Sequence, residues 1–140
     1  MLANIYLPFL YLHNYLRWAA ILLLAYALGR AFLGWLQKKK WTEADRKAAL
    51  ATTISLDLQL TIGLLLYALG GFAVSGRFLG EHIIAMVVAV VFGHLGSALP
   101  KRVDQDLRKH RRAALWFGLT ALVVLFSIPW SQPLFRGLGF

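Results

Sequence analysis

Four long blocks of apolar residues, separated by short polar segments, constrain this chain more than any other feature. The blocks run over residues 12–36, 48–74, 82–99 and 113–129. Their apolar residues are nearly continuous and do not recur at the spacing of a half-buried helix. A helix needs about 20 apolar residues to cross the hydrocarbon core of a bilayer. The sequence therefore predicts an all-α fold, an integral membrane four-helix bundle with up-down topology.

The composition supports a membrane protein, because 59% of the residues are hydrophobic and 14% are aromatic. Four helices in 140 residues leave almost nothing for a soluble unit, so we expect a single transmembrane domain over 1–140. The chain has no cysteine, which excludes disulfides, thiolate metal sites, iron–sulfur clusters and covalently attached haem. The first block is too long for a cleaved signal peptide and no basic residue precedes it.

Basic residues gather in two of the three connections, over 37–47 and 100–112. The positive-inside rule places both segments in the cytoplasm and both termini outside. The net charge of +9 is therefore a topology signal, and we do not expect nucleic-acid binding. The basic connections can also touch anionic lipid headgroups.

Two histidines are expected at the same membrane depth. His13 lies at the start of the first block and His82 at the start of the third, after a predicted turn over 75–80. Both blocks enter from the outer side, so one membrane face collects both imidazoles. Further polar and aromatic residues are expected at this face: Tyr15, Arg17, Trp18, Glu81 and Trp130.

Two imidazoles at one level of a helix bundle can hold a metal ion or a haem between them. In that arrangement Arg17 would neutralise a propionate, and Tyr15 and Trp130 would pack on the ring edge. A haem with two histidine ligands has no open coordination position, so substrate chemistry on the iron is not expected. Ordinary interfacial hydrogen bonding of both histidines is the alternative. A quinone site near these residues is compatible with the same pattern.

A second polar level lies deeper, toward the cytoplasm. His94 and Asp57 are expected to approach each other in the bundle interior, and an Arg17–Asp57 ion pair is an alternative. Gln59 lies about 200° around the helix from Asp57, so at most one of them points fully inward. His94 alone can hold a chlorophyll-type magnesium. A proton relay through these groups is a further alternative, although the chain shows no inverted repeat.

Other polar and small residues receive simpler interpretations. Arg30 is expected to extend its head group toward the interface, and His110 is expected in the cytoplasmic connection with no role. Small residues along the blocks favour close helix packing over room for a flat ring. These residues are Gly29, Gly34, Gly63, Gly70, Gly93, Gly96 and Ser97.

Several of these runs together resemble a known family. They are His-Asn-Tyr-Leu-Arg-Trp over 13–18, the stretch 59–67, Glu81-His82 with Met86 and His94, and the ending 127–130. The chain resembles small four-helix bacterial membrane proteins labelled "cytochrome b"-like, found chiefly in the Bacteroidetes. The resemblance implies a b-type haem protein, or an accessory subunit of a respiratory or photosynthetic complex, in the bacterial inner membrane. In that family a histidine often stands where this chain has Asp57, so one ligand of a second haem would be missing here.

The sequence thus predicts a multi-pass electron-transfer protein that holds haem b near the outer face through His13 and His82, with His94 as a further candidate ligand. The alternative is a cofactor-poor accessory or scaffold subunit that binds lipid or pigment. Either protein is expected to work in the lipid bilayer with other subunits of a membrane redox complex.

Overall fold

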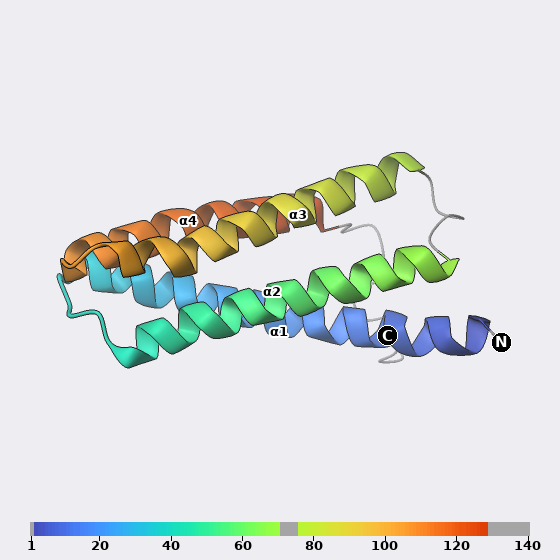
Figure 1. The fold of residues 1–140 in the computed structure, drawn as a ribbon, viewed down its shortest axis with the longest axis horizontal. Coiled ribbons are helices and arrows are strands. Elements are labelled where there is room, and N and C mark those ends of the chain that lie inside the picture. Colours follow the sequence, from blue (N-terminus) through green and yellow to red (C-terminus); the bar gives the residue numbers. More distant parts are fainter. Residues whose placement is uncertain (1, 71–75, 129–140) are drawn as a thin grey trace.

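The computed structural model describes residues 2–70 and 76–128, with side chains from residue 5 and, after the gap, from residue 80 (Figure 1). Four α-helices make up this part of the chain, and within it no strand occurs. They are α1 (Leu2–Leu36), α2 (Glu43–Gly70), α3 (Gly76–Ala98) and α4 (Asp106–Ser127), with a short 3-10 helix, η2 (Leu99–Arg102), after α3. The predicted all-α fold with four helices is confirmed.

The four helices lie side by side in an elongated bundle (Figure 1). Each of α1 and α3 packs against both α2 and α4. Tyr6 near the start of α1 lies beside Gly70 at the end of α2, and Arg30 near the end of α1 binds Asp45 at the start of α2. The α1–α2 connection and η2 meet at one end of the bundle, where both contribute to a shared pocket.

Three segments of the described chain are long and apolar enough to cross a membrane: Ile5–Leu36, Glu43–Gly70 and Gly80–Arg102. α4 is not among them, because Arg108, Lys109, Arg111 and Arg112 occupy its first turns. Large apolar side chains cover the outer surface, and Phe126 is 88% exposed. This inside-out distribution suits a lipid environment.

All four helices begin earlier than the apolar blocks predicted, α2 at Glu43 where its block begins at 48. α1 begins at Leu2 and continues through Pro8, and α4 begins at Asp106, so most of the predicted basic connection is helical. The predicted turn over 75–80 is wrong from Gly76 onward, since α3 begins there. Lysine, arginine and leucine are good helix formers, so a helix can continue beyond the apolar block that spans the membrane. A hydropathy pattern detects only the block and not this continuation.

The core between the helices consists mainly of small side chains. The buried alanines are Ala20, Ala27, Ala31, Ala48, Ala49, Ala89, Ala113 and Ala114. Glycines add to this close approach: a Cβ at Gly93 would lie 2.6 Å from Leu56, and one at Gly96 would lie 2.9 Å from the Phe117 ring. Small residues let helix backbones approach closely when lipid offers no hydrophobic drive for association. These two glycines therefore serve close helix packing.

A buried carboxylate fixes the start of α2. The backbone N–H and the hydroxyl of Thr42 both donate to Asp45 Oδ2 at 2.7 Å. Arg30 Nε donates to Asp45 Oδ1 at 2.8 Å, across the α1–α2 contact. This is the carboxylate half of a capping box, reinforced by an ion pair. The expectation that Arg30 only extends toward the interface is wrong, since Asp45 holds its head group.

Replacing Asp45 by alanine is expected to destabilise the protein by about 1–3 kcal/mol, because the change leaves the Thr42 N–H and Arg30 without this acceptor. The melting temperature of detergent-solubilised protein measures the effect. Glu43→Ala is the matched control: it removes an exposed carboxylate that pairs with Arg46 three residues on, and no measurable loss is expected. Equal losses in both variants would contradict this account of Asp45.

Candidate functional site

His13 lies on α1 and is directed at α2. Gln59 Nε2 lies 3.2 Å from His13 Nε2 and donates to the His13 carbonyl oxygen at 3.0 Å. The imidazole also rests against the α2 backbone at Gly63, where an added Cβ would lie 3.1 Å from His13 Cε1. Gln59 is buried and Asp57 is only partly so, in agreement with the predicted rotation between them.

The hydrogen bond from Gln59 defines the state of the His13 ring. An amide nitrogen can only donate, so His13 Nε2 accepts and the proton of the neutral ring resides on Nδ1. Within the described chain, His13 Nδ1 and Gln59 Oε1 are both buried and have no hydrogen-bond partner. Buried polar atoms are normally satisfied, so the Nδ1–H of His13 and the Oε1 of Gln59 are exceptions at this level of the bundle.

His82 on α3 is oriented by α4. Its Nδ1 lies 2.9 Å from the carbonyl oxygen of Ser127. A carbonyl oxygen can only accept, so Nδ1 carries the proton and the lone pair of the neutral ring is on Nε2. Ligand histidines in metal sites are commonly held this way, with the second ring nitrogen donating to a backbone carbonyl. The last turn of α4 thus fixes the tautomer of the His82 ring.

The structure brings the two predicted ligand histidines into one neighbourhood. His82 and Arg17 both lie close enough to His13 for direct electrostatic interaction. The two histidines come from α1 and α3, each of which packs between α2 and α4. Each ring forms a hydrogen bond with a neighbouring helix: His13 with Gln59 on α2, and His82 with Ser127 on α4.

The remaining residues predicted for this level differ in their placement. The Arg17 guanidinium lies 5.8 Å from the centre of the Trp18 ring. Tyr15 is 48% exposed and so belongs to the outer surface of α1. Glu81 is exposed at the beginning of the apolar part of α3, and Trp130 lies outside the described residues.

Asp57 and His94 form a separate pair between α2 and α3. His94 Nε2 lies 2.9 Å and 3.1 Å from the two carboxylate oxygens of Asp57. The two residues meet as expected, but on the surface and not in the interior: their side chains are 55% and 46% exposed for His94 and Asp57.

His110 was expected in a connection without a role, and that expectation is wrong. It lies in α4, is 1% exposed, and its ring centre is 4.9 Å from that of Trp41. Its ring fills the space above Gly34, and its Nε2 lies 3.4 Å from the Lys40 carbonyl oxygen. The sequence carried a usable signal, because 110, 113, 114 and 117 fall on one helical face that is otherwise apolar.

Within the described ranges, no group of three or more histidine, cysteine or carboxylate side chains is arranged to hold a metal ion. A haem with two axial histidines does not need such a group. Comparisons of the chain with protein-family models, with curated proteins and with solved structures each found no match.

Proposed function

We propose that this chain is a membrane-embedded electron-transfer protein or subunit that holds a b-type haem near the His13–His82 end of the bundle. The observation that carries the proposal is the hydrogen bond from His82 Nδ1 to the Ser127 carbonyl oxygen, which leaves the lone pair on Nε2. His13, on the other side of the bundle axis, lies within electrostatic range of this imidazole.

The two candidate ligands fit haem iron to different degrees. His82 has the required tautomer as it stands. His13 has its Nε2 engaged by Gln59, so it fits after one exchange in which Gln59 keeps its second hydrogen bond, to the His13 carbonyl oxygen. Arg17 supplies a cation beside the site, which suits a propionate. Haem held in this way would carry one electron at a time, with no position for a substrate on the iron.

The proposed setting is the bacterial inner membrane, with an up-down arrangement of four crossings and both termini outside. Three apolar helices of sufficient length support the membrane location. The basic residues of 37–47 and 100–112 gather at the end of the bundle away from His13 and His82, as the positive-inside rule requires for this orientation. The haem would then exchange electrons between a quinol pool or partner subunit and an acceptor outside.

A reduced-minus-oxidised visible spectrum of the detergent-purified protein, with a pyridine haemochrome assay, tests the proposal. We expect a sharp alpha band and about one haem per chain, because one pair of axial ligands is available. A featureless spectrum from folded protein that was expressed with adequate haem supply would contradict the proposal.

A second candidate is an accessory subunit of a respiratory or photosynthetic membrane complex. The half-exposed Asp57–His94 pair favours it, since ionisable side chains are costly on a lipid-facing surface and are usually covered. Asp57 occupies His94 Nε2, so Nδ1 is the nitrogen that remains for a partner group or a pigment magnesium. Co-purification with a redox complex, together with a featureless spectrum of the isolated chain, would favour this candidate.

A further inference from the structure

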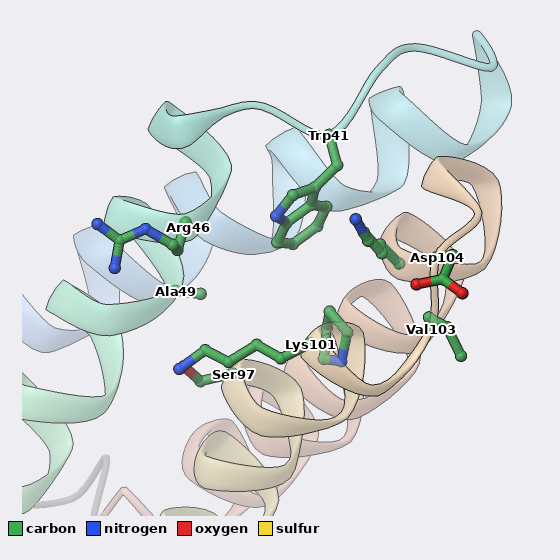
Figure 2. Close-up of a pocket in the computed structure, with 9 residues that line it drawn as sticks. Trp41, Arg46, Ala49, Ser97, Lys101, Val103 and Asp104 are labelled. Carbon is green, nitrogen blue, oxygen red and sulfur yellow. The ribbon is translucent and has the colours of Figure 1, made fainter.

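A pocket of about 260 Å³ opens at the end of the bundle opposite His13 and His82 (Figure 2). The α1–α2 connection, the start of α2, the end of α3, η2 and the start of α4 all contribute to its walls. The residues that matter for its chemistry are Trp41, Arg46, Ser97, Lys101, Asp104 and Lys109. Segments far apart in the sequence therefore build one concave site.

The pocket carries an excess of positive charge. Three cationic side chains line it, Arg46, Lys101 and Lys109, against a single carboxylate, Asp104. Arg46 also binds the exposed Glu43, so the two lysines supply most of the uncompensated charge. Neither lysine forms an ion pair within the described chain. A site with this balance favours an anion of one or two negative charges.

One wall of the pocket is anchored to the protein core. Trp41 packs against the fully buried His110, with ring centres 4.9 Å apart. Pro100, which is also buried, begins the 3-10 turn that carries Lys101. A tryptophan next to lysines, where apolar helices end, is the arrangement found at the headgroup level of a membrane. An anion that reaches such a pocket from the bilayer would be a lipid phosphate.

We infer that this pocket binds the phosphate of an anionic phospholipid, with Lys101 and Lys109 as the principal cations and the Ser97 hydroxyl as a neutral donor. Basic pockets between membrane helices on the cytoplasmic side bind such headgroups. Trp41 would lie along the glycerol and upper acyl region. The inference does not depend on haem, so either can fail without the other.

Native mass spectrometry of the detergent-solubilised full chain, titrated with phosphatidylglycerol or phosphatidylcholine, tests this site. We expect phosphatidylglycerol to bind preferentially and the double variant Lys101→Gln/Lys109→Gln to weaken that binding about tenfold or more. Lys38→Gln/Lys39→Gln is the matched control, because it removes the same charge from exposed residues at the same end that do not line the pocket. The control is expected to change binding less than about twofold.

Equal losses in the two double variants, or no preference for phosphatidylglycerol, would overturn the inference. The double variant Lys101→Arg/Lys109→Arg separates loss of charge from misfolding, because it keeps both positive charges and should retain lipid binding. Soluble sn-glycerol 3-phosphate distinguishes the source of the phosphate. If it displaces the lipid at equal concentration, the site serves a soluble phosphate compound and the lipid assignment fails; no displacement supports the lipid.

Discussion

Replacing His82 by alanine is expected to abolish the reduced-minus-oxidised haem spectrum of the purified protein, while the helices remain folded. The reason is specific to this side chain, because the Ser127 carbonyl oxygen holds its Nδ1 and so places the lone pair on Nε2. Loss of one axial ligand leaves five-coordinate iron, which binds more weakly and loses the low-spin spectrum. Haem per chain and the alpha band are the measurements, with circular dichroism and gel filtration as checks on folding.

Variants at the neighbouring positions sharpen that prediction. His13→Ala is expected to have the same effect, whereas His94→Ala is the matched control and should leave the spectrum unchanged, because His94 binds Asp57 elsewhere. Gln59→Leu should retain haem, since it removes only the group that competes for His13 Nε2. A normal low-spin spectrum in both His82→Ala and His13→Ala would refute the assignment of the ligands.

Gly34→Ala is expected to destabilise the bundle by about 1–3 kcal/mol, which is large for the addition of one methyl group. An added Cβ at this position would overlap the ring of His110. His110 cannot withdraw easily, because it is 1% exposed and packs on Trp41. The melting temperature in detergent measures the change. Gly29→Ala, on the same helix with nothing within 4 Å of its added Cβ, is the matched control and should be neutral or stabilising.

The cost of Gly34→Ala should depend on His110. His110→Ala alone is expected to destabilise the protein by about 2–4 kcal/mol through the cavity it leaves. In that background Gly34→Ala should cost little or even stabilise, because the new methyl group enters the cavity. A double-mutant cycle on melting free energies measures this coupling. An unchanged cost of Gly34→Ala without His110 would show that another contact is responsible.

The helical fold and the membrane-spanning character could be predicted from the sequence because both depend on local properties. Long apolar blocks fix which segments can cross a bilayer, and they located the central part of each helix correctly. The helix ends could not be obtained in the same way. The segment 76–80 is part of α3, and the basic start of α4 is helical too. A hydropathy pattern does not distinguish such polar helical turns from a loop.

The candidate site was partly accessible from the sequence for a similar reason. The positions of His13 and His82 along the helix axes follow from where their apolar blocks begin. The opposite orientation of Gln59 and Asp57 follows from the helical repeat. The partners Gln59 and Ser127 lie 46 and 45 residues away from the histidines they bind. No local pattern predicts such contacts.

By itself the sequence determined four helices, their apolar character, and the relative position and angle of residues along each helix. Only the tertiary structure decided that Asp57–His94 lies on the surface, that Arg30 binds Asp45, and that His110 fills the space above Gly34. The physical reason is that helix–helix contacts depend on the rotation of each helix about its own axis and on its shift along its neighbours. Interlocking of small and large side chains across the whole bundle sets both, and no single segment carries that information.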